Sequence, residues 1–130
     1  VEIALEARGR AARGQPIAVA GSLSHMVPLA SGTQLGDPLR VPSEQILRES
    51  FRELADTLAD AGCDLILLEM MSHPVRARFA LEAARTTGLP VWVGLSARSE
   101  QGQVISYVRE GFPFGEAVSQ IPLVAPLLHE

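Results

Sequence analysis

The chain alternates between stretches in which apolar residues recur with a helical period and short apolar runs that are typical of buried strands. Residues 1–13 place Ile3, Leu5 and Ala12 among Glu and Arg at roughly helical spacing, and Gly14 follows as a stop signal. Residues 15–22, QPIAVAGS, predict a short strand. Residues 23–42 hold three Pro and two Gly without a clear period, so we expect a long loop that carries function.

A second helix is predicted after this loop, with Ser43 as its N-cap and Ala61-Gly62 as its end. Its apolar stripe consists of Leu47, Phe51, Leu54 and Leu58. The run CDLILLE, residues 63–69, follows directly and predicts a second strand. Helix and strand therefore succeed each other with almost no linker.

The second half of the chain repeats this succession. A third helix is predicted from its cap Ser72 to its stop Gly88, with Pro74 in the first turn. One face of this helix carries Val75, Phe79 and Ala83. Residues 91–96, VWVGLS, predict a third strand and residues 97–111 a polar loop. Residues 113–130 look helical but are broken by Pro122 and Pro126.

The resulting order is helix, strand, helix, strand, helix, strand, helix. Strict alternation with short, almost continuous apolar strands indicates an α/β fold of parallel βαβ units with right-handed crossovers. About three such units fit into residues 1–130, which we treat as one partial domain. The chain begins with Val1 in the body of a predicted helix, so we expect it to be a piece of a longer protein.

Polar side chains stand where each predicted strand ends, at Ser22, Glu69 and Ser96. In parallel α/β folds functional groups gather at the carboxyl ends of the strands. Alternation along the strand puts Glu69 on the face of Leu65 and Leu67. The opposite face carries Ile66, Leu68 and Met70, and we expect that face to meet the helices.

Two interpretations of Glu69 remain open, since burying an unpaired carboxylate costs several kcal/mol. Glu69 either forms a structural salt bridge with a neighbouring strand or loop, or is held for a ligand. His25 follows a strand end and suits a metal ligand or a base, but no second ligand stands at metal-binding spacing, which favours a structural role. Ser22, Ser24 and His25 lack the surroundings of a hydrolase nucleophile.

Composition narrows the class of protein further. The 130 residues are 47% hydrophobic with a net charge of -4, and all eleven basic residues are scattered Arg, which argues against a nucleic-acid partner. Cys63 is the only cysteine, so no internal disulfide is possible and a reducing compartment fits best. It stands at the end of the sheet away from the expected site. Without a leader or a membrane-spanning run, the expected location is the cytoplasm, with no membrane partner.

Three segments together resemble the middle of the homocysteine S-methyltransferase family. They are PIAVAGSLS at 16–24, SFRELADTLADAGCDLILLEMMS at 50–72, and TGLPVWVGLSA at 87–97 followed by a GQVIS turn. The resemblance implies a TIM-barrel (β/α)8-type fold, of which this chain holds the third to fifth strands. It also implies transfer of a methyl group to the thiol of homocysteine, giving methionine, from a donor such as S-methylmethionine, betaine or a methylated folate.

The resemblance assigns roles to particular residues. The glutamate that ends the fourth strand of the family matches Glu69 and binds the amino group of the substrate. From their places near the strand ends, and not from the resemblance, we expect Ser22, Ser24 and Ser96 to be weaker contributors at the rim. A zinc ion held by cysteines lowers the pKa of the substrate thiol. Those cysteines have no counterpart in residues 1–130, so we expect them outside this sequence and no metal ligand within it.

Departures from the family pattern lie close to the site. SLSHM at 22–26 replaces a Ser-Leu-Gly-Pro type of loop, and Met70-Met71 replaces Thr-Ile. Two alternatives therefore stay open: a barrel enzyme that acts without metal on another small metabolite, and an inactive partial barrel that serves as an interaction module. In isolation the 130 residues are expected to be inactive and to self-associate, because three parallel strands cannot close a barrel.

Overall fold

The computed structural model describes residues 1–25, 27–33, 35–108 and 110–121. The helices are α1 (Glu2–Ala11), the 3-10 helix η1 (Pro38–Arg40), α2 (Glu44–Asp60), α3 (Pro74–Arg85) and α4 (Phe114–Ser119). The strands are β1 (Ala20–Ser24), β2 (Leu65–Met71), β3 (Val91–Leu95), β4 (Ala97–Glu100) and β5 (Gln103–Ser106). Among these described residues, no helix combines the length and the apolar character needed to cross a membrane.

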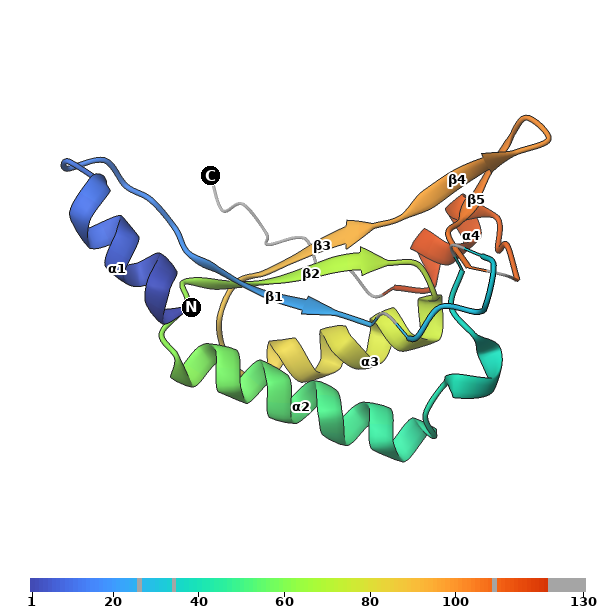
Figure 1. Ribbon diagram of the computed structural model, residues 1–130, viewed down its shortest axis with the longest axis horizontal. Coiled ribbons are helices and arrows are strands. Elements are labelled where there is room, and N and C mark those ends of the chain that lie inside the picture. Colours follow the sequence, from blue (N-terminus) through green and yellow to red (C-terminus); the bar gives the residue numbers. More distant parts are fainter. Residues whose placement is uncertain (26, 34, 109, 122–130) are drawn as a thin grey trace.

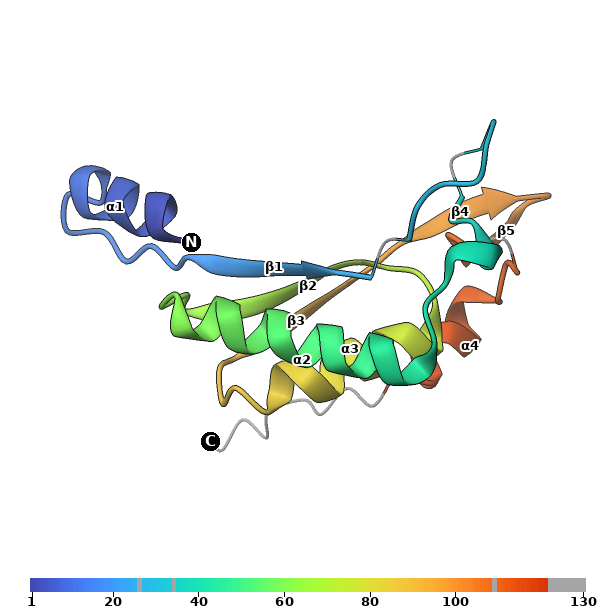
Figure 2. The same cartoon turned by 60° about the horizontal axis from the view of Figure 1, so that its bottom comes forward.

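Strands β1, β2 and β3 form one parallel sheet in that order, with β2 at its centre. Both α2 and α3 lie on the same face of the sheet, and α1 lies at the end where the strands begin (Figures 1 and 2). A short parallel strand needs a crossover connection, and here each crossover is a helix. The mixed α/β fold with a parallel sheet is therefore as the alternation of elements predicts.

Local signals set the ends of α2. The Ser43 hydroxyl accepts a hydrogen bond from the Ile46 N–H at 3.4 Å, which satisfies one free donor of the first turn. After the helix, Gly62 adopts a φ of +83°, a conformation that costs glycine little. Both ends of this helix are confirmed as predicted.

Other boundaries differ from the sequence-based expectation. Strand β1 covers Ala20–Ser24 rather than residues 15–22, because its register partner in β2 begins only at Leu65, opposite Ala20. The N-cap of α3 is His73, whose backbone is extended (φ −111°, ψ 117°), and not Ser72, whose N–H donates to the side chain of His25. The predicted helix at 113–130 is present as α4, and residues 122–130, with both of their prolines, lie outside the described residues.

Residues 97–111 do not form the simple polar loop that was expected. Strands β4 and β5 pair antiparallel in a hairpin whose turn residues are Gln101 (φ +50°) and Gly102 (φ +79°). Two consecutive positive φ values match the right-handed twist of a tight hairpin. The hairpin was missed because its strands are only four residues long and mostly polar.

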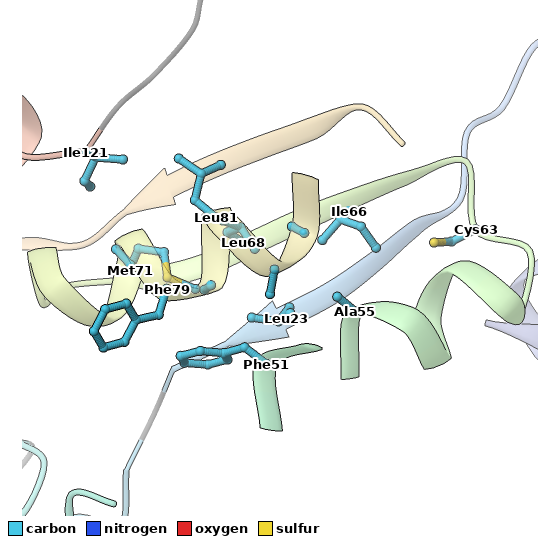
Figure 3. Packing of buried hydrophobic residues seen from close by; sticks show 14 residues of the cluster. Leu23, Phe51, Ala55, Cys63, Ile66, Leu68, Met71, Phe79, Leu81 and Ile121 are labelled. Carbon is cyan, nitrogen blue, oxygen red and sulfur yellow. The ribbon is translucent and has the colours of Figure 1, made fainter. Parts of the chain in front are cut away.

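The hydrophobic core lies between the sheet and the two helices that cover it. Figure 3 shows side chains from β1 and β2 packed against those of α2 and α3. Ile66 and Leu68 on the central strand are fully buried and Phe51 and Phe79 supply the helix side. Burial of one such aliphatic side chain contributes about 1.5–3 kcal/mol, so β2 is the energetic centre of the sheet.

The other face of the sheet is much more open. Trp92 is 64% exposed, and Ser22 and Gly94 are exposed on the same face, whereas Leu65 at the start of β2 is buried. In Figure 2 no described helix lies against this face along β3. The sheet therefore has one closed and one open side.

Gly21 marks the closest approach of β1 to α2. A Cβ at this position would lie 2.9 Å from the Cys63 Sγ and 3.0 Å from the Leu58 Cβ. We expect Gly21→Ala to lower the free energy of unfolding by about 1–3 kcal/mol in urea denaturation, because strand and helix must separate. Gly9→Ala, where nothing lies within 4 Å, is the control and should not destabilise. If Gly21→Ala were as stable as the parent, the packing of β1 against Leu58 and Cys63 would be loose enough to admit a methyl group.

Candidate functional site

The carboxyl ends of the three parallel strands bring two of the predicted site residues side by side. Ser24, the last residue of β1, is the register partner of Glu69 on β2. Both side chains are partly buried. Partners in a parallel register project to the same face, so Ser24 and Glu69 form one polar position on the open side of the sheet.

The other two predicted serines, Ser22 and Ser96, are not register partners of Glu69. Ser22 pairs with Leu67, one step before Glu69 on the same face, and is exposed. Ser96 follows β3, where its N–H donates to the Met71 carbonyl at 2.9 Å and its own carbonyl accepts from the Tyr107 N–H at 3.0 Å. Ser96 thus joins β2 to the segment after the hairpin.

A β-bulge in β2 immediately follows Glu69. Leu68 pairs with Val93 and Met71 pairs with Leu95, so β2 carries one residue more than β3 over this stretch. Met70 takes up the extra residue with a φ of +54°, which is unusual for a residue with a side chain. Strain of this kind gathers at functional sites in proteins, which supports this edge as the site.

The bulge corrects the expected orientation of Met70. Alternation along a regular strand predicted that Met70 shares the helix-facing side with Ile66 and Leu68. Instead Met70 is 47% exposed, and Met71 is buried in the core in its place. The extra residue shifts the alternation by one position, and a shift by one position exchanges the two faces.

Among the described residues, no cation neutralises the Glu69 carboxylate. Within the part of the chain that the structure describes, neither an ion pair nor a hydrogen bond engages its carboxylate. By contrast, Asp64 at the other end of β2 is paired with Arg8 and accepts from the Val19 N–H at 2.6 Å. Of the two interpretations of Glu69, the structural salt bridge finds no partner among these residues.

His25 ties the end of β1 to the start of α3. It is 4% exposed, and its Nε2 accepts hydrogen bonds from the Ser72 N–H at 2.7 Å and the His73 N–H at 3.2 Å. An acceptor nitrogen carries no proton, so the proton of the neutral ring sits on Nδ1. This geometry gives His25 a structural task, and it occupies the nitrogen that a base or a metal ligand would use.

Burial and a nearby cation keep His25 uncharged. Loss of hydration lowers the pKa of His25 to about 4, and the positive charge of Arg76 acts in the same direction. Burial also lowers the pKa of His73, whose ring makes an edge-to-face contact with Phe112 at 5.5 Å between centroids. Both imidazoles are therefore neutral near pH 7.

The sequence analysis missed Arg76, the most unusual charged residue at this edge. Arg76 is only 8% exposed, and its Nε and Nη1 have no hydrogen-bond partner in the described part of the chain. A signal was present in the sequence, since Arg76, Ala80 and Ala84 follow one another at i, i+4 spacing and so share one face. Ala80 and Ala84 are fully buried, whereas Val75 from the expected apolar face is 39% exposed.

The described residues do not fit a zinc centre. No group of three or more His, Cys, Asp or Glu side chains among them is arranged to hold a metal ion. Cys63, the one thiol, is buried against Gly21 just before β2 begins, at the edge opposite Glu69. A zinc-bound thiolate would need ligands that these residues do not supply.

Comparison with known proteins completes this description. None of the curated proteins gave a significant match to the chain. A protein-family model described as homocysteine S-methyltransferase matches residues 1–126, which is nearly the whole chain. This chain, with its parallel sheet and its carboxylate at the carboxyl edge, belongs to the homocysteine S-methyltransferase family.

Proposed function

We propose that this chain is part of a methyltransferase that moves a methyl group to the thiol of homocysteine and so forms methionine. Family membership supports methyl transfer of this type. We further propose that β1, β2 and β3 are a section of a (β/α)8-type barrel whose open sheet face lines the lumen. The one-sided helix covering and the exposed Trp92 support that arrangement.

The observation that carries the proposal is the unpaired Glu69 carboxylate at the carboxyl edge of the sheet. An α-ammonium group is a natural partner for it, because a charge-assisted hydrogen bond repays the partial loss of hydration. Ser24 lies beside Glu69 in the register, and Ser22 and Ser96 line the same edge on either side. In this proposal Glu69 binds the amino group of homocysteine, and the serines contribute to the rim.

The proposed reaction is a nucleophilic displacement at the methyl carbon. The thiol of homocysteine loses its proton, the sulfur forms a new bond to the methyl carbon, and the bond from that carbon to the donor breaks with its electron pair going to the donor. We assign to residues of this chain only the holding and orientation of the amino acid. Zinc belongs to the proposal through the family, with ligands outside this sequence.

Glu69→Gln in the protein that carries this chain tests the assignment. Glutamine keeps the shape and one acceptor oxygen but removes the charge, so we expect homocysteine to bind more weakly by about 1.5–3 kcal/mol, or tens to hundreds of fold. Isothermal titration calorimetry with L-homocysteine measures this loss. The melting temperature should stay close to that of the parent.

Glu82→Gln is a suitable control because Glu82 does form a structural ion pair, with Arg48 at 2.6 Å. This control should leave the affinity for homocysteine unchanged. If Glu69→Gln behaved like Glu82→Gln, with full affinity and at most a small loss of stability, Glu69 would have no role in substrate binding.

A further inference from the structure

A small cavity lies beside the first turn of α3, away from the open face that carries Trp92. It has a volume of about 20 Å³, somewhat more than one water molecule needs. Its polar lining residues are His25, Ser72, Arg76 and Tyr107, and Val27 and Val108 supply apolar wall. The loop after β1, the start of α3 and the segment after β5 meet here, so only the folded chain assembles this cavity.

Arg76 places an uncompensated positive charge in the wall of the cavity. Arg76 is more than nine-tenths buried, and two of its three guanidinium nitrogens have no hydrogen-bond partner among the residues that the structure describes. The acid that acts on it from nearby is Glu110, which is exposed and forms no ion pair with Arg76. Burying an unpaired charge lowers the stability of the fold, so a bound anion that pairs with Arg76 would stabilise it.

The other polar groups at the cavity also favour a negatively charged ligand. His25 has used its Nε2 as an acceptor, and its buried Nδ1 has no partner, which leaves one more N–H donor. Helix α3 is twelve residues long and has no side-chain cap at its first turn, where the backbone carries partial positive charge. Donors and positive charge thus converge, while both neighbouring histidines are neutral.

We infer that this cavity binds one carboxylate group, presented by a small organic acid. The planar guanidinium fork of Arg76 matches the two oxygens of a carboxylate, and a single cation balances a single negative charge. A doubly charged phosphate would leave one charge uncompensated next to Val27 and Val108. The inference does not depend on which reaction the protein catalyses.

Acetate is the probe that tests this inference directly, in the ¹⁵N-labelled protein that carries this chain. At constant ionic strength, acetate should shift the Arg76 Nε–H and the backbone signals of Ser72 and His73 along a saturable curve. Arg76→Gln should weaken acetate binding at least tenfold, and Arg76→Lys, which keeps the charge but loses the fork, should weaken it less. Arg78→Gln, on the exposed side of the same helix, is the matched control and should bind acetate like the parent.

Glu110 provides a second, opposite prediction. Removing its negative charge with Glu110→Gln should tighten acetate binding several-fold, because a competitor for the Arg76 charge is lost. Looser binding in Glu110→Gln, unchanged binding in Arg76→Gln, or no saturable response to acetate in the parent would each overturn the inference. Equal affinity for acetate, chloride and phosphate would also overturn it, since the cavity would then select charge and not a carboxylate.

Two further probes identify the source of the carboxylate. L-methionine carries an α-carboxylate, and L-methioninamide is the same molecule with that charge removed. If the ligand is an amino acid, L-methionine should bind more tightly than acetate and L-methioninamide should not shift the Arg76 signal. If it is a simple acid, acetate should bind at least as well as L-methionine. Binding of L-methioninamide as tight as that of L-methionine would overturn the inference.

Discussion

Leu68→Ala should lower the free energy of unfolding by about 3–5 kcal/mol. Leu68 is fully buried on the central strand, between β1 and β3 on either side and the helices beneath. Truncation removes buried methyl groups and leaves a cavity that a strand held by two neighbours cannot collapse to fill. Urea denaturation followed by circular dichroism measures the change.

Leu39→Ala is the control for the same chemical change. Leu39 is 92% exposed on η1, so its truncation should alter the free energy of unfolding by less than about 0.5 kcal/mol. A loss below 1 kcal/mol for Leu68→Ala would mean that the core around β2 is loosely packed in solution. In that case the buried cluster would not be what holds the sheet against α2 and α3.

Acidification below pH 6.5 should destabilise the fold, because of His25. The folded pKa of His25 is about 4, below the ordinary value of 6.5 that it has in the unfolded chain. Its contribution to stability is therefore complete above pH 6.5 and is lost as the pH falls from 6.5 to 4. The shift corresponds to a loss on the order of 3 kcal/mol at the acidic end.

His73, near His25, and Asp64, at the other end of β2, also have shifted pKa values, and neither changes the sign of the effect. The pKa of His73 is also lowered from its ordinary value of 6.5, so the stability that the neutral His73 ring contributes is likewise lost as the pH falls below that value. Asp64 has a lowered pKa, because it accepts a hydrogen bond from the Val19 N–H and lies beside Arg8, and its contribution is lost only below pH 3.8. Unfolding measured in urea between pH 7.5 and 4.5 therefore isolates the histidines.

His25→Gln separates the contribution of His25 from that of His73. The Gln oxygen can accept from the Ser72 and His73 N–H groups in place of Nε2, but it does not titrate. The variant should show a clearly smaller loss of stability between pH 7.5 and 4.5. An identical pH dependence in parent and variant would place the effect elsewhere and would argue that His25 is hydrated and free to ionise.

Sequence patterns predicted those features that depend on neighbours along the chain. The cap at Ser43, the stop at Gly62 and the amphipathic stripe of α2 are satisfied within a few residues, so the predicted helix and the observed one agree. The parallel sheet follows from the order of elements, because only helical crossovers fit between such short strands. Glu69 was found by the same logic, since the predicted strand at 63–69 ends at a carboxylate, although β2 continues to Met71.

Other features follow only from contacts between distant residues. Ser72 has every local qualification as a helix cap, yet α3 begins one residue later with His73 as its cap, and the N–H groups of both residues donate to His25, nearly fifty residues earlier. The bulge at Met70 depends on the register between β2 and β3, and no nearby residue signals it. The burial of Arg76 likewise results from three segments that meet only in the folded chain.

The sequence by itself thus determined the main helices, the three parallel strands and the edge at which Glu69 stands, because short-range propensity and periodicity decide these, whereas the antiparallel hairpin of β4 and β5 gave no such signal. Tertiary structure alone decided which face Met70 takes, which residue caps α3, and that His25 is a neutral buried acceptor beside an unpaired Arg76. The physical reason is that hydrogen-bond partners, burial and desolvation are properties of residues brought together from far along the chain. The order of residues along the chain does not by itself show which distant residues come into contact.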